Sequence, residues 1–284
     1  MSGETEAGEA TRYSAESIEG YFGQYGDREW QRLVETPVDE VSLHIHTHYL
    51  RKHVLAGARV LEIGAGAGRF TQVLADLGAR VLVADISAVQ LELNKRHAHE
   101  YGFADAVEDW QQVDICDMSR YGDGSFDRVV AYGGPLSYVL DRRDVALGEC
   151  LRVLRSGGAL LSSVMSLWGS AHRHLQGVLA VPAEANRRII ETGDLLPETF
   201  PGREGSFMHL FRAGELKEWL ARTGVTLLDL SASGCLSVGW EGALEQIRDD
   251  PEAWGELLRI ELEASAEEGS LNMGTHLIAV VRKP

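Results

Sequence analysis

Short apolar runs alternate with segments of helical periodicity along most of this chain. Residues 60–63 form an apolar run typical of a buried strand, and residues 69–77 place apolar side chains at helical spacing. Residues 81–85 form a second apolar run, and residues 89–101 follow with another helical pattern. Strands that alternate with helices in this way predict an α/β fold, with helices on both faces of a parallel sheet.

The same alternation extends toward both ends of the chain. A helix at 143–154 follows the fourth strand, and residues 275–281 form the last strand. Pro251 marks the start of a helix, because proline suits the first helical position. The further predicted helices are 15–33, 38–55, 241–247 and 252–264.

Three alternating glycines follow the first strand: Gly64, Gly66 and Gly68. Bare main chain lets a ligand lie against the backbone and permits positive φ. The second strand ends in Asp85, a carboxylate that can accept from both hydroxyls of a ribose. Strand, glycine turn, helix, strand and acid together form the first βαβ unit of a nucleotide-binding sheet.

The glycine spacing argues against a dinucleotide ligand. The dinucleotide fingerprint is GxGxxG, in which the last glycine allows close packing of helix on strand. In this chain that position holds Arg69. Because Glu62 stands two residues before Gly64, the run Glu-x-Gly-x-Gly-x-Gly resembles motif I of the class I S-adenosylmethionine (SAM) methyltransferases, whose ligand carries no phosphate.

Three further segments lie where that family would place them. Residues 113–115 resemble the end of the third strand, where the family uses an acid, here Asp114, to accept from the adenine amino group. Residues 125–134 resemble the fourth strand, whose end lies beside the transferred methyl group, and residues 151–161 resemble the next helix, glycine turn and fifth strand. The resemblance covers 60–165 closely and returns at 212–230 and 274–283.

The resemblance implies a Rossmann-like, seven-stranded, mostly parallel sheet and a SAM site made largely of main-chain groups. Gly64 and Tyr132 would offer main-chain groups to the methionine end, and Ile86 and Ile115 would enclose the adenine. We expect Glu62 to fix the glycine loop rather than to contact the ligand. The predicted cofactor-binding residues are Tyr21, Arg32, Glu62, Gly64, Ala65, Gly66, Gly68, Asp85, Ile86, Asp114, Ile115 and Tyr132.

Residues 21–32 are rich in aromatic side chains and resemble the entry helix that closes over SAM in small-molecule members. Tyr21 or Tyr25 would cover the sulfonium through a cation–π contact. A helix stripe that packs on the core is the alternative interpretation of the same residues. Arg32 would hold the methionine carboxylate.

Methyl transfer from a sulfonium needs positioning more than acid–base chemistry, because the methyl group is already activated. Positioning accounts for roughly 7–11 kcal/mol of barrier reduction. A base is required only where the acceptor must lose a proton. The predicted catalytic residues are Tyr138, on the acceptor side, and the candidate bases His174 and His209.

The predicted organisation has four parts. Residues 1–55 form a helical segment that closes over the cofactor, with disorder up to about residue 11, and residues 56–165 form the SAM-binding core. Residues 166–211 are a helical lid and acceptor pocket, because they leave from the carboxyl end of a strand, where ligands bind in this fold. Residues 212–284 complete the sheet and carry a helical insertion at 237–272.

Composition and charge limit the classes of molecule that we expect this chain to bind. A formal net charge of −16 and the lack of a basic cluster argue against nucleic acid and an anionic membrane surface. No apolar run approaches the roughly 20 residues that span a bilayer. The scattered Cys116, Cys150 and Cys235 predict a reducing cytoplasm and no disulfide framework. We expect no metal, because no cysteine or carboxylate cluster completes a ligand set around the histidines near residues 44–53.

These observations predict a SAM-dependent methyltransferase that transfers the methyl group to an O, N or C atom of a small molecule and releases S-adenosylhomocysteine. The expected partners are this small-molecule acceptor and a second copy of the chain in a homodimer. Three alternatives stay open at this point. A SAM-binding protein of this fold could catalyse a non-methyl reaction such as a cyclisation, or bind SAM without turnover. A nicotinamide-dependent reductase would require a dinucleotide site, which Arg69 disfavours.

Overall fold

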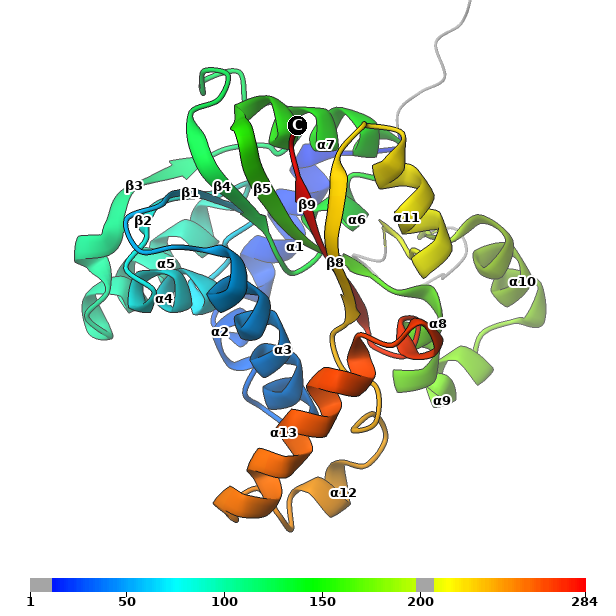
Figure 1. Cartoon of the computed structure of the whole chain (residues 1–284). Coiled ribbons are helices and arrows are strands. Elements are labelled where there is room, and N and C mark those ends of the chain that lie inside the picture. The colour runs from blue at the N-terminus through cyan, green and yellow to red at the C-terminus, as the bar shows by residue number, and fades with distance from the viewer. Residues whose placement is uncertain (1–11, 198–206) are drawn as a thin grey trace, which may run out of the picture.

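The computed structural model describes residues 12–197 and 207–284, so the predicted disorder before residue 12 lies outside the described residues. A seven-stranded sheet in the order β3-β2-β1-β4-β5-β9-β8 forms its centre (Figure 1). Strand β9 is antiparallel to both neighbours, and the other pairs are parallel. This confirms the predicted Rossmann-like sheet. The strands are β1 (Arg59–Ile63), β2 (Arg80–Asp85), β3 (Val107–Gln112), β4 (Phe126–Ala131), β5 (Leu154–Met165), β8 (Thr226–Ala232) and β9 (His276–Arg282).

Side chains along the buried strands alternate between the two faces of the sheet, and each face packs into its own hydrophobic core. In β1, Leu61 and Ile63 pack on one face, while Val60 packs on the other. The first face is covered by α6 (Pro135–Tyr138), α7 (Arg143–Val153) and α11 (Ala213–Ala221). The second face is covered by α3 (Pro37–His53), α4 (Arg69–Asp76) and α5 (Ala88–Glu100).

The N-terminal helix differs from the prediction of one helix over 15–33. It is divided into α1 (Ala15–Tyr25) and the short α2 (Arg28–Gln31). Gly26 separates them with φ of 59°, a left-handed conformation that ends a helix and that glycine adopts without strain. The break turns α2 toward the glycine loop.

Other boundaries also differ from the prediction. Strand β3 ends at Gln112, so Asp114 lies in the turn after the strand rather than at its end. The predicted helix 241–247 is shortened to α12 (Glu241–Leu244). Within residues 12–197 and 207–284 there are three 3₁₀ turns: η1 (Ala104–Ala106), η2 (Leu140–Arg142) and η3 (Glu268–Ser270).

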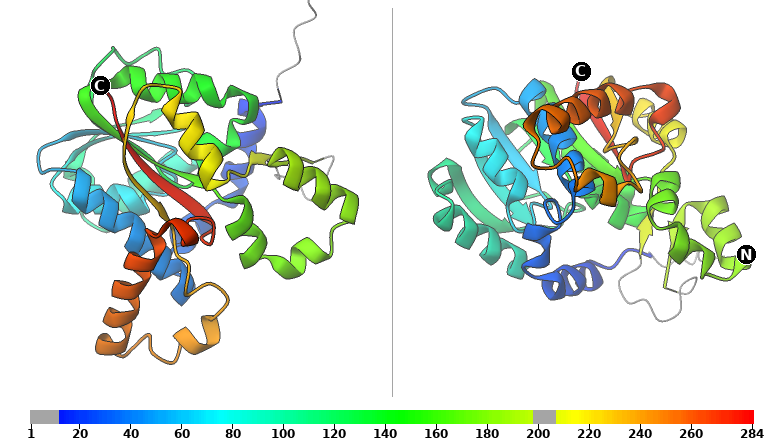
Figure 2. Two further views of the ribbon diagram at one scale, coloured as in Figure 1. Left: turned by 45° about the vertical axis from the view of Figure 1, so that its right-hand side comes forward. Right: turned by 90° about the horizontal axis from the view of Figure 1, so that it is seen from below.

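Two insertions project from the sheet on the same side as its carboxyl edge (Figures 1 and 2). The second insertion packs α12 and α13 (Pro251–Ser265) against α3. The first contains α8 (Leu167–Arg173), α9 (Leu175–Leu179), α10 (Ala183–Thr192), β6 (Asp194–Leu195) and β7 (Met208–His209).

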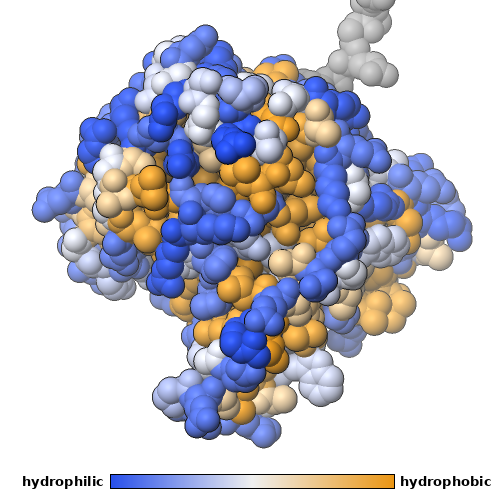
Figure 3. All heavy atoms as spheres, viewed as in Figure 1, coloured by the Kyte–Doolittle hydropathy of each residue, from blue (hydrophilic) through white to orange (hydrophobic). Residues whose placement is uncertain are grey.

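Hydrophilic residues cover much of the face seen in Figure 3, with apolar residues exposed between them. Exposed apolar side chains occur on both insertions, with Leu179 at 75% and Trp240 at 64%. Among the described helices, none is long and apolar enough to cross a bilayer.

Candidate functional site

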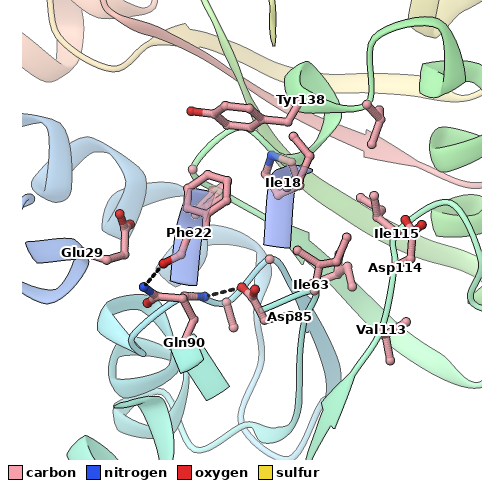
Figure 4. Close-up of a pocket in the computed structure, with 18 of the residues that line it drawn as sticks. Ile18, Phe22, Glu29, Ile63, Asp85, Gln90, Val113, Asp114, Ile115 and Tyr138 are labelled. Atoms are coloured by element: carbon pink, nitrogen blue, oxygen red, sulfur yellow. Dashed lines mark hydrogen bonds between the residues drawn. The ribbon is translucent and has the colours of Figure 1, made fainter. Parts of the chain in front are cut away.

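A cavity with about 790 Å³ of open space lies at the carboxyl ends of β1, β2 and β4. This edge is where ligands bind in open α/β sheets. Figure 4 shows Phe22, Glu29 and Tyr138, from α1, α2 and α6, around the same cavity as Asp85 and Asp114. The N-terminal helices therefore form part of its wall.

The glycine loop runs along the cavity with left-handed backbone. Gly64 has φ of 71° and Gly66 has φ of 54°, conformations that residues with a side chain rarely adopt. A Cβ at Gly64 would lie 2.5 Å from Cγ of Pro135, and one at Gly66 would lie 3.1 Å from Cγ of Glu29. Any larger residue would therefore push against α6 or α2 and narrow the cavity.

Asp85 joins the glycine loop to the end of β2. Its Oδ2 accepts from the Gly66 amide at 2.8 Å, and its Oδ1 accepts from the Ser87 amide at 2.8 Å. Burial raises the pKa of the carboxyl to about 6, although these amides partly oppose the shift. Two further donors, such as the hydroxyls of a ribose, would stabilise the charged form.

A buried polar network, of which the sequence indicated only Glu62, lies behind the glycine loop. Thr71 donates to Glu62 at 2.6 Å, and the Asn94 amide donates to Thr71 at 2.9 Å and to the Gly66 carbonyl at 3.2 Å. Trp110 donates to the Asn94 carbonyl oxygen at 3.0 Å. Burial raises the pKa of Glu62 to about 8. Asn94 gives no sequence signal, because a polar residue within a helix is usually exposed.

Asp114 has a partner that the sequence did not suggest. Tyr13 donates its hydroxyl to Oδ1 at 2.9 Å, and the Cys116 amide donates to the same oxygen at 2.7 Å. Tyr13 comes from the segment before α1, about a hundred positions away along the chain. Asp114 and Tyr13 both line the cavity, with Ile115 beside them.

Most of the predicted cofactor residues lie on this cavity wall, but Tyr21, Glu62 and Gly68 do not. Glu62 faces the network behind the loop, Gly68 caps α4 next to Asn94, and Tyr21 packs on Phe22 and Tyr25. The predicted residues on the wall are Arg32, Gly64, Ala65, Gly66, Asp85, Ile86, Asp114, Ile115, Tyr132 and Tyr138. The residues on the wall that were not predicted include Tyr13, Ile18, Phe22, Glu29, Gln90 and Pro135.

The structure does not bring the two candidate bases to the cavity. His209 is 2% exposed, and its ring nitrogens lie 2.7 Å from Asp194 Oδ1 and 2.7 Å from Glu215 Oε1. Those hydrogen bonds outweigh burial and raise the pKa of His209. His174 is exposed at the junction of α8 and α9. Neither histidine lines the described part of the cavity, and their role as bases stays a prediction.

A second cavity, with about 710 Å³ of space open to solvent, adjoins the first. Ile18 and Tyr138 line both cavities, so they form the boundary between them. The first insertion reaches the ligand region here rather than through its helices. The other lining residues are Arg12, Ser14, Ser17, Leu140, Leu196, Pro197 and Phe207.

Among residues 12–197 and 207–284, no group of three or more His, Cys, Asp or Glu side chains is arranged to hold a metal ion. The cavity instead presents bare glycine backbone, the buried carboxylate of Asp85 and the partly buried carboxylates of Glu29 and Asp114. These groups fit an uncharged adenosine part with several hydroxyl and amino donors, and they include no cluster of cations for a pyrophosphate.

Comparison with known proteins agrees with this geometry. A family model described as "Methyltransferase domain" matches residues 61–162. The ubiquinone biosynthesis O-methyltransferase of Nitrosococcus oceani is 27% identical over 212 residues, which cover 74% of this chain and 81% of the relative. A ubiquinone/menaquinone biosynthesis C-methyltransferase of Hahella chejuensis is 36% identical over 132 residues, or 43% of this chain and 51% of the relative.

Solved structures show the same fold. The 1,6-didemethyltoxoflavin-N1-methyltransferase of Burkholderia thailandensis has a TM-score of 0.55 at 17% identity, covering 95% of this chain and 88% of its own. The [4+2]-cyclase SpnF has a TM-score of 0.51 at 20% identity, covering 84% of this chain and 79% of its own. The family match and the curated relatives decide against a nicotinamide-dependent reductase. The chain belongs to the class I SAM-dependent methyltransferases.

Proposed function

We propose that this methyltransferase transfers the SAM methyl group to a small molecule that binds in the second cavity. The observation that carries the proposal is the shared boundary at Ile18 and Tyr138, which places the two cavities side by side. The named relatives support a small acceptor, because they methylate O or C atoms in quinone biosynthesis. The atom methylated in this chain's acceptor stays open among O, N and C.

The first cavity has the groups that SAM requires. We assign the ribose hydroxyls to Asp85, the adenine amino group to Asp114 and the methionine end to the glycine loop. Ile86 and Ile115 offer apolar surface for the adenine ring. When bound, SAM supplies a methyl group on a sulfonium, which is already activated for transfer.

The residues at the boundary exclude water and orient the acceptor. Phe22 packs edge to face on Tyr138, with ring centroids 5.2 Å apart, and Ile18 is 6% exposed. Burial raises the pKa of the Tyr138 phenol, so its hydroxyl stays protonated at neutral pH. We therefore assign Tyr138 as a hydrogen-bond donor to the acceptor rather than as a base.

The described lining of the two cavities contains no histidine, lysine or cysteine. An acceptor that arrives as a nucleophile, such as a phenolate, an enolate or an amine, would need no base from the protein. Transfer then depends on positioning, which is worth roughly 7–11 kcal/mol when the reacting atoms are held in line.

The second cavity suits a flat apolar acceptor with polar substituents. Leu140, Leu196 and Phe207 supply apolar surface, while Ser14 and Ser17 contribute polar groups. Leu140 has φ of 44°, an uncommon conformation for a residue with a side chain. Such strain concentrates at functional sites, which supports a role for this wall.

An acceptor screen tests the proposal, using SAM labelled in the methyl group and measuring both labelled product and S-adenosylhomocysteine. Ser17→Trp places an indole in the second cavity, and we expect turnover to fall while SAM affinity is unchanged. Glu16→Trp is the matched control, because Glu16 is an exposed neighbour on α1 that does not line either cavity. Equal activity of both variants would contradict the acceptor site.

Label that never enters a product would instead favour a non-methyl reaction such as the cyclisation considered from sequence. The division into four parts, the cytoplasmic location, the homodimer and the absence of nucleic-acid partners stay predictions.

A further inference from the structure

Two oppositely charged side chains, Glu29 on α2 and Arg32 directly after it, lie over the glycine loop. Glu29 and Arg32 are paired through two contacts: Nη2 to Oε1 at 2.6 Å, and Nε to Oε2 at 3.0 Å. Both line the first cavity, and their side chains are 18% and 29% exposed. Glu29 approaches the position of a Cβ on Gly66 to 3.1 Å, and Arg32 approaches that on Gly133 to 3.8 Å.

These positions correspond to the methionine end of the proposed SAM site. That end is an α-amino acid, with an ammonium group and a carboxylate a few ångströms apart. From the geometry we infer that Glu29 and Arg32 exchange their mutual ion pair for one with this zwitterion: Glu29 accepts from the ammonium, and Arg32 donates to the carboxylate. The inference rests on the proposed placement of SAM, and it adds a carboxylate partner that the sequence did not indicate.

The exchange avoids the main cost of charged groups in a partly buried site. A charge that loses its partner in such a place is strongly destabilised. Here each charge leaves one partner for another, so neither side chain is left unpaired at the end. A planar guanidinium also suits a carboxylate through two parallel hydrogen bonds. The same residues therefore satisfy each other in this structure and can satisfy the ligand when it binds.

A four-residue helix such as α2 cannot hold this position by its own stability. Arg69 anchors it instead. The Arg69 guanidinium stacks 3.8 Å from the centre of the Trp30 ring and donates to the Trp30 carbonyl at 2.6 Å. His97 packs on the same indole, with ring centroids 4.2 Å apart. Trp30 lies between Glu29 and Arg32 in sequence, so fixing it fixes the pair.

This contact gives Arg69 a physical role at the position where the dinucleotide fingerprint has its last glycine. A glycine there would leave Trp30 without its stacking partner and without the donor to its carbonyl. We assign Arg69 as a positioning residue, because it does not line either cavity.

The test compares two ligands by titration calorimetry. S-adenosylhomocysteine carries the amino-acid end, whereas 5′-methylthioadenosine has the same adenosine and sulfur without it. For Glu29→Gln and Arg32→Met, we expect affinity for S-adenosylhomocysteine to fall roughly tenfold to a hundredfold, as for loss of a charge-assisted hydrogen bond. Affinity for 5′-methylthioadenosine should stay within about twofold of wild type.

Arg28→Met is the matched control, since it removes an arginine from the same helix outside both cavities; it should leave both affinities unchanged. Arg69→Ala should weaken S-adenosylhomocysteine selectively, without removing a ligand contact. Equal losses for the two ligands, or no loss in Glu29→Gln and Arg32→Met, would overturn the inference while the SAM site stands. Failure of the wild-type protein to bind either ligand would instead overturn the placement of SAM.

Discussion

Single residues at this site owe their roles to burial as much as to charge. Asp85 and Glu62 are 5% and 3% exposed, yet they differ in what surrounds them. Asp85 accepts from two backbone amides and faces the cavity, whereas Glu62 accepts from one hydroxyl behind the loop. The first therefore stays closer to its charged form, and the second is held neutral near pH 7.

The Asp85 carboxylate predicts a pH dependence of cofactor affinity. Its pKa of about 6 lies above the ordinary value, so the proton is favoured in the free protein below that pH. Two ribose hydroxyls require the charged form, so affinity should fall as pH drops below about 6 and level off above it. Calorimetry with S-adenosylhomocysteine between about pH 5 and 8 measures this. Asp85→Ala should lose one to two orders of magnitude in affinity; unchanged affinity would place the ribose elsewhere.

For Glu62 we expect the opposite of the Asp85 result, because Glu62 is held neutral and its replacement by a neutral isostere should be tolerated. Its raised pKa of about 8 means that folding favours the protonated form, so its contribution to stability falls as pH rises from about 4.5 to 8. Glu62→Gln should keep the partner of Thr71 and melt above wild type at pH 9. Glu62→Ala should melt lower at every pH, since it leaves the Thr71 hydroxyl without its acceptor. Melting curves at two pH values separate these outcomes.

At the scale of elements, a single buried side chain joins segments that are far apart in sequence. His209 in β7 bridges Asp194 in β6 and Glu215 in α11, and Arg12 pairs with Asp194 at 2.8 Å. Arg143 adds an unfavourable charge toward His209. The arrangement ties the first insertion to the sheet and to the segment before α1, so these contacts give His209 a structural role.

The hydrogen-bonded cluster of His209, Asp194 and Glu215 should become less stable as pH rises. The pKa of His209 is raised in the folded protein. Its contribution to stability is therefore fully present below about pH 6.5, the ordinary pKa of histidine, and is lost as the pH rises through the higher pKa of the folded state. We expect limited proteolysis within residues 166–211 to accelerate above neutral pH. His209→Gln should show fast cleavage at all pH values and unchanged affinity for S-adenosylhomocysteine. A large loss of that affinity would contradict a purely structural role.

At the scale of the molecule, what the sequence predicts well is local and periodic. The strands at 60–63 and 81–85, the glycine loop and Asp85 all follow from patterns within about thirty residues. The sheet confirms the two strands, while the roles of the loop and of Asp85 in binding stay predictions. The contact of Tyr13 with Asp114 depends on chain reversals across the whole fold. The same is true of Ser17 and Phe207, which line one cavity. No periodicity encodes such contacts, so the second cavity could not be predicted.

The second insertion shows how a buried carboxylate can hold distant parts of the whole molecule together. Glu261 on α13 is fully buried, and it accepts from the Cys235 amide at 2.5 Å, the Leu236 amide at 3.0 Å and the Ser237 hydroxyl at 2.9 Å. These donors lie in the loop after β8, while α13 itself packs against α3. The residue therefore connects the sheet edge, the insertion and a helix that covers the core.

Glu261→Leu should consequently destabilise the whole fold rather than the insertion alone. Each buried donor left without an acceptor costs about 1–3 kcal/mol, so several together should lower the unfolding free energy by about 3 kcal/mol or more. Glu263→Leu is the control on the same helix, because its exposed pair with Arg259 contributes little. Urea unfolding followed by fluorescence and circular dichroism would check this. Coincident transitions at a lower midpoint are expected for Glu261→Leu, whereas an early separate transition would show that the insertion unfolds independently of the sheet.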